Sequence, residues 1–158
     1  MHFETVDWLD PRAIALRTAM DIETSAMYAD RQEAQSPEVT QAVMDALTVD
    51  PATITHTVIA LDEGVPVAHA ALRPFGDELE VKKVYVAPTA RGRGYSSAIM
   101  LELERVAGER GIHSLILQTG DRQIAAMRLY ERLGYERIEV FGLYGAIPAS
   151  VCYRKMVA

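Results

Sequence analysis

Two closely spaced glycines, flanked by arginines, stand between a strand-like segment and a helix-like one. Arg91-Gly92-Arg93-Gly94-Tyr95-Ser96 follows Pro88 and opens a helical run to about Arg110, with Gly111 placed to end it. A glycine-rich turn at a helix start leaves several backbone N–H groups without intrahelical partners, and the helix dipole adds partial positive charge there. This stretch therefore predicts a binding site for a phosphate or pyrophosphate.

The segment before this turn, Leu79 to Val86, is typical of a strand because it is rich in β-branched and aromatic residues. Its aliphatic residues occupy odd positions before Lys82 and even positions after Lys83. One inserted residue would return both sets to the same face, so the pattern predicts a β-bulge at the lysines. A twist or an exposed lysine pair is the alternative. A bulge would bend the strand away from its neighbour and leave backbone groups facing the gap.

Helix-start signals precede two segments in the first third of the chain. Asp10-Pro11 can cap and begin a helix that is expected to run to about Tyr28 or Ala29. Ser36-Pro37-Glu38 repeats the signal before a shorter helix from Val39 to Leu47. One face of the first helix combines the residues Ile14, Thr18, Ile22 and Ala26.

Strand patterns follow these helices. Thr53 to Leu61 and Val65 to Arg73 are joined by Asp62-Glu63-Gly64, which predicts a hairpin. A second turn at Phe75-Gly76-Asp77 leads into the strand with the two lysines, so three strands form an antiparallel meander. Phe3 to Trp8 is expected to be a short first strand.

The chain after the glycine turn alternates helix and strand. Ser114 to Gln118 reads as a buried strand, and Ala125 to Leu133 as a helix that Gly134 ends. A strand–helix–strand sequence predicts a parallel crossover, so the carboxyl ends of both strands should meet the glycine turn at a ligand crevice. Two last strands are expected near Tyr135 to Val140 and Val151 to Met156. The helix after the turn has one apolar arc, made of Ile99, Met100, Leu103, Val106 and Ala107.

These patterns predict an α/β fold of the α+β type in a single domain, residues 1–158. A mixed central sheet of about six or seven strands would hold an antiparallel meander and then a parallel pair splayed by the bulge, with about four flanking helices.

Composition narrows the possible partners. A net charge of −6 argues against nucleic acid and weakly suits cationic substrates such as amines. The single cysteine, Cys152, cannot form an internal disulfide, which favours a reducing cytoplasm. No apolar run is long enough for a bilayer and no signal peptide is evident, so no membrane partner is expected. The histidines show no metal-ligand spacing, and no metal site is expected.

The chain resembles the GCN5-related N-acetyltransferase (GNAT) superfamily, small bacterial type, over nearly its whole length. Arg91 to Ser96 is similar to the family's acetyl-CoA motif, Gln or Arg, two residues, Gly, one residue, then Gly or Ala, with Ser96 at the last position. Gln118 to Asp121 and Ala126 to Tyr135 resemble the second motif, and Ser150 to Lys155 the final strand. The resemblance implies the acyl-CoA N-acyltransferase fold, acetyl-CoA as co-substrate, and transfer of its acetyl group to a primary amine of a small molecule or peptide. A homodimer is possible.

The resemblance also implies which residues bind the cofactor. Many relatives have Asn near Asp121, where it contacts the pantetheine arm. Arg91 and Arg93 would pair with CoA phosphates, or form a solvated turn. The implied contacts come from the bulged strand, the glycine turn and the second motif: Val84, Tyr85, Val86, Arg91, Gly92, Arg93, Gly94, Tyr95, Ser96, Asp121 and Ala126.

Two residues are candidates for proton transfer. Glu80 stands where some family members place a base that takes a proton from the amine; otherwise it is a solvated strand residue. Tyr130 matches the family's general acid, which would protonate the leaving thiolate; otherwise it is an aromatic residue at the core edge. The backbone N–H of Val86 or a neighbour could polarise the thioester carbonyl, as in related enzymes.

Two other functions compete with catalysis. A CoA-binding sensor or partner module would need the glycine turn but neither Tyr130 nor Glu80. A dinucleotide-binding domain fits less well, because Ser97 stands at the third glycine position of Gly-x-Gly-x-x-Gly and a meander precedes the turn.

Overall fold

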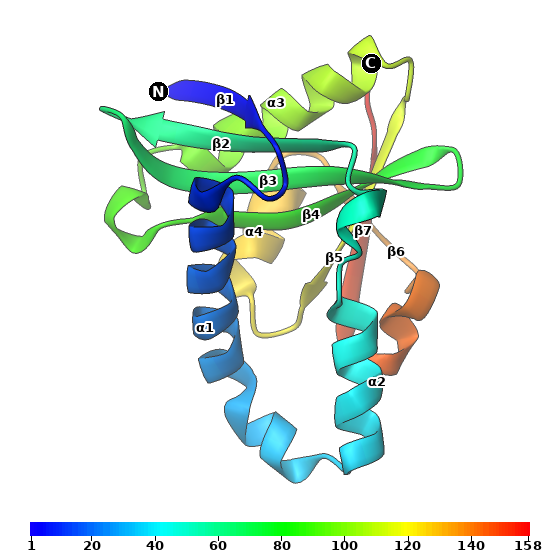
Figure 1. Ribbon diagram of the computed structural model, residues 1–158. Helices are drawn as coiled ribbons and strands as arrows, with labels where there is room; N and C mark the ends of the chain where they lie inside the picture. Colours follow the sequence, from blue (N-terminus) through cyan, green and yellow to red (C-terminus); the bar gives the residue numbers. More distant parts are fainter.

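Seven strands form one sheet in the order β1-β2-β3-β4-β5-β7-β6 in the computed structural model, which describes residues 1–158 (Figure 1). Four α-helices accompany the sheet, in the number predicted. The elements follow one another as β1 (His2–Val6), α1 (Pro11–Ala34), α2 (Pro37–Leu47), β2 (His56–Asp62), β3 (Val65–Phe75), β4 (Glu78–Val86), α3 (Tyr95–Glu109), β5 (Ser114–Gly120), α4 (Ile124–Arg132), β6 (Glu136–Ile138) and β7 (Ser150–Met156), with 3₁₀ helices η1 (Pro51–Thr53), η2 (Pro88–Ala90) and η3 (Gly142–Ala146).

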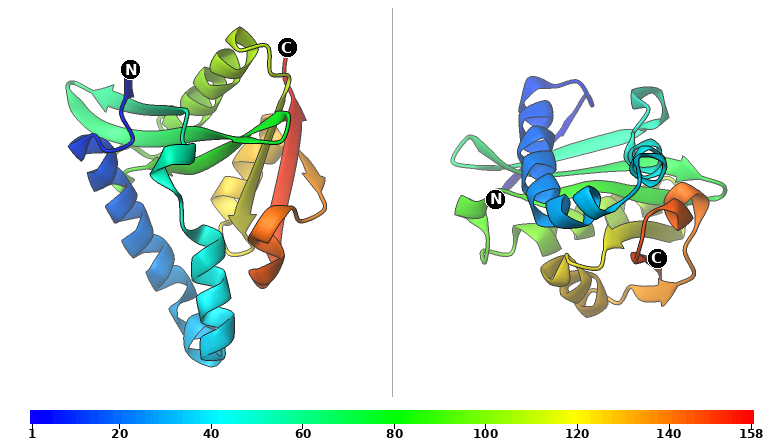
Figure 2. Two further views of the ribbon diagram at one scale, coloured as in Figure 1. Left: turned by 45° about the vertical axis from the view of Figure 1, so that its right-hand side comes forward. Right: turned by 90° about the horizontal axis from the view of Figure 1, so that it is seen from below.

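The sheet is antiparallel except where β4 meets β5. Strands β1 to β4 form an antiparallel series, and β7 pairs antiparallel with both β5 and β6. The parallel pairing of β4 with β5 covers only Leu79 with Leu115 and Glu80 with Ile116. Beyond this point the two strands separate, and β5 and β7 run steeply away from the meander (Figure 2).

The bulge that the lysine pair predicts is present in β4. Between Lys82 and Tyr85, two residues, Lys83 and Val84, lie opposite one residue of β3. Lys83 takes φ 55°, a left-handed conformation that is uncommon for a residue other than glycine. The bulge bends β4 away from β5 where their pairing ends.

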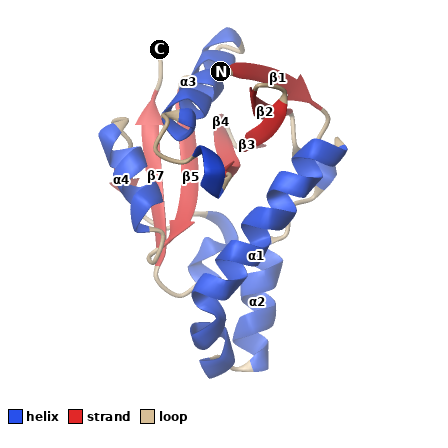
Figure 3. Ribbon diagram, turned by 90° about the vertical axis from the view of Figure 1, so that its left-hand side faces the viewer, coloured by secondary structure: helices blue, strands red, loops and turns tan.

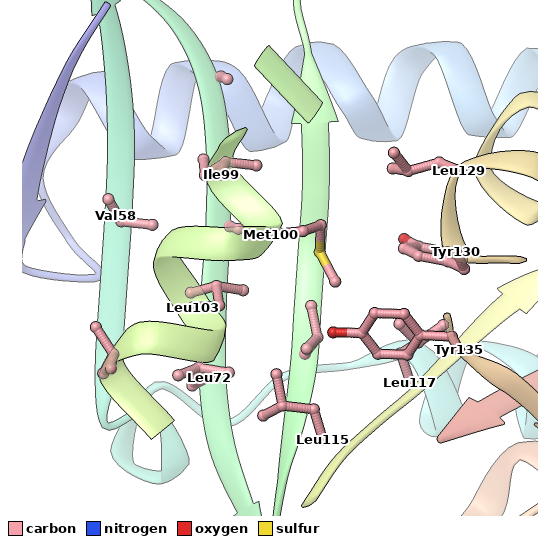
Figure 4. Close-up of a cluster of buried hydrophobic side chains, with 14 of the residues drawn as sticks. Val58, Leu72, Ile99, Met100, Leu103, Leu115, Leu117, Leu129, Tyr130 and Tyr135 are labelled. Atoms are coloured by element: carbon pink, nitrogen blue, oxygen red, sulfur yellow. The ribbon is translucent and has the colours of Figure 1, made fainter. Parts of the chain in front are cut away.

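The face of the sheet that α3 and α4 cover holds the main hydrophobic core. The apolar arc predicted for α3 is confirmed, since all five of its residues are buried. Figure 4 shows three of them, Ile99, Met100 and Leu103, pointing into the core. On α4, Leu129 and Tyr130 are buried while Ala126 packs at the cluster's margin. Helices α3 and α4 thereby hold the turn before α3 and the inner face of α4 on the same side of β4.

Helix α1 lies on the opposite face and differs from its prediction in length and orientation. It reaches Ala34 because no helix-breaking signal occurs before Ser36-Pro37. Its buried residues are Ala13, Leu16 and Arg17, whereas the predicted face is turned outward, with Ile22 68% exposed. Arg17 fixes this orientation through polar contacts that hydrophobic periodicity does not register.

The second half of α1 and all of α2 project beyond the sheet as a helical hairpin (Figure 3). Ser36 caps α2, its Oγ accepting a hydrogen bond from the N–H of Val39 at 3.2 Å. Some strand boundaries shift: Thr53 belongs to η1, and β6 is shorter than the predicted strand. None of the helices combines the length and the apolar character needed to cross a membrane.

Two leucines of α3 test how the helix is packed. Leu103 is fully buried and Leu101 is 53% exposed. Leu103→Ala should lower the free energy of unfolding by about 2–5 kcal/mol, because it removes core contacts and leaves a cavity. Leu101→Ala, the matched control, should change it by less than about 0.5 kcal/mol. Urea unfolding followed by circular dichroism measures both, and equal losses would contradict this packing.

Candidate functional site

The glycine turn presents a row of unpaired backbone donors. Gly92 and Gly94 adopt φ 75° and φ 85°, which their lack of a side chain permits. The backbone N–H groups of residues 92–97 have no acceptor in the protein, and no side chain caps α3. Consecutive free N–H groups at a helix start fit a pyrophosphate.

A first cavity of about 470 Å³ opens beside this turn, between the end of β4 and the start of α4. Its lining confirms the expected proximity of the bulged strand, the turn and the second motif. It also includes residues of α1 and the β5–α4 loop, for which no sequence motif gave a signal: Met20, Glu23, Thr24, Met27, Arg122 and Gln123. All the sequence-predicted site residues line it except Arg93, Asp121 and Glu80.

The two arginines of the turn are held by carboxylates of neighbouring elements. Arg91 pairs with Glu23 at 2.7 Å and donates from Nε to the carbonyl of Val86 at 3.0 Å. Arg93 pairs with Asp62 at 2.6 Å. Both guanidinium groups are about half exposed, so the turn's inward donors are its backbone N–H groups.

Asp121 does not reach the first cavity. Both of its oxygens accept hydrogen bonds from Arg31 of α1, at 2.7 and 2.9 Å, and this contact lowers the pKa of the carboxyl group. The side chain therefore ties the β5–α4 loop to α1. It does not lie where it could make the expected contact with the cofactor's pantetheine arm.

Glu80 does not line the first cavity either, and it lies in a buried cluster of charges. Its carboxylate accepts from Arg73 Nε at 2.6 Å and from the hydroxyl of Tyr144 in η3, and it lies 3.7 Å from Lys82 Nζ. Glu80 itself is 0% exposed. A carboxylate so enclosed has no path to the amine of a bound acceptor, so direct proton abstraction by Glu80 is not supported.

Tyr130 combines a packed ring with an unpaired hydroxyl. Its ring lies edge-on to Tyr135 at 5.8 Å and tilted to Tyr153 at 5.9 Å between centroids. Burial raises the pKa of the phenol, which stays protonated at neutral pH. The hydroxyl makes no hydrogen bond within the protein, and it points from α4 toward β4 (Figure 4). It can therefore donate to a ligand between the two elements.

A second cavity, of about 560 Å³, lies on the other side of the bulge. It reaches from α1 and the end of α2 to β4, β5 and α4. The two cavities share Met20, Thr24, Val84, Gln123, Ala126 and Tyr130, so they meet where β4 and β5 part. Burial lowers the pKa of Lys82, which lines the second cavity, to about 8, against the attraction of Glu80.

His69 links α1 to the bulge in one defined tautomer. Arg17 can only donate, so its Nη1 gives a hydrogen bond to Nε2 of His69 at 3.0 Å, and Nδ1 must donate to the carbonyl of Lys83 at 2.7 Å. Burial, with help from the charges of Arg17 and Lys83, lowers the pKa of His69 to about 4. The imidazole is therefore neutral and structural, as expected of a packed histidine.

The site thus combines a bulged strand, a glycine turn with free N–H groups and two joined cavities. The model of the acetyltransferase (GNAT) family matches residues 16–135, and the chain therefore belongs to this family. A curated relative, an IAA acetyltransferase of Azospirillum brasilense, is 36% identical over 76 residues, 48% of this chain and 50% of that protein. The chain thus spans about half the length of this relative in the match.

Solved structures agree on the fold. A Klebsiella pneumoniae protein provisionally named acyl-CoA N-acyltransferase is 27% identical, with a TM-score of 0.77 over 99% of this chain and 97% of its own. A GNAT family acetyltransferase from Elizabethkingia anophelis, solved with acetyl-CoA bound, is 13% identical, with a TM-score of 0.71 over 99% of this chain and 97% of its own. At 13% identity, the similarity to the Elizabethkingia anophelis protein shows a shared fold and nothing more.

The neutral state of His69 predicts a pH dependence of stability. The unfolded chain binds a proton at this histidine as pH falls through about 6.5, while the folded protein resists protonation down to about 4. The stability that this group contributes is present above pH 6.5 and is lost as pH falls toward 4, by about 3 kcal/mol. His69→Gln should flatten this part of the profile.

Urea unfolding at several pH values between 4 and 7.5 measures the effect. His113→Gln, at an exposed position, is the matched control and should keep the wild-type slope. If the free energy of unfolding depends on pH in the same way in wild type and in His69→Gln, the folded protein accepts a proton at His69 without loss of stability, and the prediction is wrong.

Proposed function

We propose that this protein is an N-acetyltransferase that uses acetyl-CoA to acetylate a primary amine. The observation that carries the proposal is the free hydroxyl of Tyr130, which borders the same cavity as the unpaired N–H groups of residues 92–97. One feature suits a pyrophosphate and the other suits the leaving group of a thioester. The match to the acetyltransferase family supports the proposal that both features bind the same acetyl-CoA molecule.

The first cavity is the proposed site of acetyl-CoA. The N–H groups of the turn would hold its pyrophosphate, while Val84, Tyr85 and Val86 present strand backbone that β5 does not pair. A backbone N–H of this stretch that faces the gap can stabilise the oxyanion that develops from a thioester carbonyl. The second cavity, which joins the first at Val84 and Tyr130, is the proposed site of the acceptor.

The transfer requires three proton movements. The acceptor ammonium loses one proton to water or a base so that its nitrogen can form the new C–N bond, and the nitrogen loses a second proton to water or a base after that bond has formed. The C–S bond then breaks, and the sulfur takes a proton. Tyr130, whose hydroxyl has no partner in the protein, is the proposed donor of that proton.

Glu80 has a different proposed role from that of a direct base. Its buried carboxylate holds Arg73, Lys82 and Tyr144 together next to the second cavity. We therefore assign it as a positioning residue that fixes Lys82 on the cavity wall. A CoA-binding module without catalysis would require neither this cluster nor the unpaired phenol. Binding of acetyl-CoA by the wild-type protein without thiol release from any amine would favour that alternative.

Gly94→Val tests the proposed pyrophosphate site. A Cβ at Gly94 meets nothing within 4 Å in the protein, but it stands at φ 85° beside the free N–H groups. The variant should weaken acetyl-CoA binding by about tenfold or more, as expected when a charged hydrogen bond is lost. Isothermal titration calorimetry measures this affinity.

Gly76→Val is the matched control. Gly76 also has a positive φ, 58°, with nothing within 4 Å of an added Cβ, but it lies in the β3–β4 turn outside both cavities. Both variants should lose about 1–3 kcal/mol of stability from backbone strain, and only Gly94→Val should lose affinity. Wild-type affinity in Gly94→Val would place the phosphates elsewhere.

Tyr130→Phe tests the proposed acid. The ring contacts remain, so melting temperature and acetyl-CoA affinity should stay close to wild type. Turnover, measured as thiol release with an accepted amine, should fall by about 10²–10⁴-fold. Tyr153→Phe is the control, because its hydroxyl donates to Glu131 at 3.0 Å and faces neither cavity. Full activity in Tyr130→Phe would remove the phenol from the mechanism.

A further inference from the structure

Cationic side chains outnumber carboxylates on the walls of the second cavity. Arg17, Lys82 and Lys83 line it, with Asp21 as the one acidic residue. This local excess of positive charge is opposite to the net charge of −6 of the whole chain. It therefore reflects the cavity itself and not the general composition.

Of the three cations on this wall, Lys83 is neutralised by an ion pair, and Lys82 is neutralised only in part. Lys83 Nζ lies 3.1 Å from a carboxylate oxygen of Asp21. Glu80 is engaged at 2.6 Å by Arg73, so Lys82, at 3.7 Å, shares a carboxylate that another cation already binds. Arg73 and Lys82 together therefore exceed Glu80 by one positive charge.

Arg17 forms no ion pair within 4 Å, although it is only 8% exposed, and the nearby carboxylate of Asp21, which attracts it, is paired with Lys83. Its three contacts are neutral: the carbonyl of Trp8 at 2.6 Å, the Nε2 of His69 at 3.0 Å, and the indole ring of Trp8, 3.5 Å from centroid to guanidinium carbon. These contacts fix the guanidinium but do not neutralise it. A buried cation without a counter-ion is unfavourable unless a ligand supplies one.

We propose that Arg17 and Lys82 bind a carboxylate of the acceptor, so that the acceptor is an amine that also carries an acidic group, as amino acids do. This inference rests on the proposed acetyl transfer. A guanidinium with a fixed orientation can bind a carboxylate through two parallel hydrogen bonds, and an ammonium adds a further charge-assisted contact. Both residues line the cavity that Tyr130 and Val84 connect to the acetyl-CoA site.

The rest of the second cavity suits a neutral substituent on the acceptor. Met44, Leu47 and Val49 give it an apolar end, and Thr24 and Ser25 of α1 give it hydroxyl groups. A polyamine or an aminoglycoside would bring further cations toward Arg17 and Lys82, where like charges repel. The same two residues would thus select amino acids and exclude polycations.

Matched pairs of acceptors test this specificity. L-methionine and 3-(methylthio)propylamine differ by the carboxylate, as do L-phenylalanine and phenethylamine; spermidine represents the polycations. Thiol release should show at least a tenfold higher kcat/KM for the carboxylate member of at least one pair, and no preference for spermidine. Preference for spermidine or for the amines without a carboxylate would overturn the inference while leaving the acetyltransferase proposal intact.

Variants of Arg17 and Lys82 test whether these two residues cause the preference for acceptors with a carboxylate. Arg17→Gln and Lys82→Met should each lower kcat/KM for the preferred amino acid by about 10- to 100-fold, mainly through KM, and change the paired amine little. Arg17→Lys should restore part of the loss. Arg105→Gln, on the outer face of α3, is the matched control and should behave as wild type. Because Lys82 makes one hydrogen bond, to Tyr144, Lys82→Met tests the subsite even if Arg17→Gln unfolds.

A binding measurement separates this inference from the proposed activity. Trp8 is the only tryptophan and covers Arg17, so its fluorescence reports ligands there. N-acetyl-L-methionine should give a saturable change that N-(3-methylthiopropyl)acetamide does not, and Lys82→Met should weaken it at least tenfold. Such a response without turnover of any acceptor would contradict the transferase alone. Equal responses to both compounds, or none to either, would contradict the carboxylate subsite.

Discussion

The bulge in β4 is the constraint on which the site depends. A strand that kept its pairing with β5 along its whole length would leave no backbone group free and no gap between the two strands. The extra residue at Lys83 and Val84 turns β4 aside after the pairing of Glu80 with Ile116. The gap joins the two cavities, and the free hydroxyl of Tyr130 faces it.

The bulge is itself held by contacts from outside the sheet. His69 donates to the carbonyl of Lys83 and accepts from Arg17 of α1, so the strained residue is fixed from the helix side. Lys83 pairs with Asp21 on the same helix. On the other side of the bulge, η3 supplies Tyr144 to Lys82 and Glu80. The polar contacts of α1 and η3 therefore support the geometry of the gap and at the same time shape the second cavity.

Charge is distributed unevenly between the surface and this interior. The chain as a whole is acidic, yet the turn arginines pair with Glu23 and Asp62, and the unneutralised charges lie around the second cavity. Surface ion pairs contribute little to stability, so their main effect here is to tie the turn to α1 and to the β2–β3 connection. The buried cations have a larger effect, because low polarity strengthens their attraction for an anion.

The sequence by itself determined the features that arise from neighbouring residues. The parity change at Lys82 and Lys83 located the bulge, the glycine spacing located the free N–H groups, and the period of α3 gave its buried face. Such features depend on local backbone conformation and on which side of an element is apolar, so a short stretch of sequence contains the information.

Only the tertiary structure decided which charged groups meet. Arg31 pairs with Asp121 across 90 positions, and Tyr144 reaches Glu80 across 64. These pairings removed Asp121 and Glu80 from the cleft, and a similar long-range contact, between Arg17 and His69, set the orientation of α1. Hydrogen bonds and ion pairs act through space between residues far apart in the chain, and the pattern around each residue does not reveal its partner.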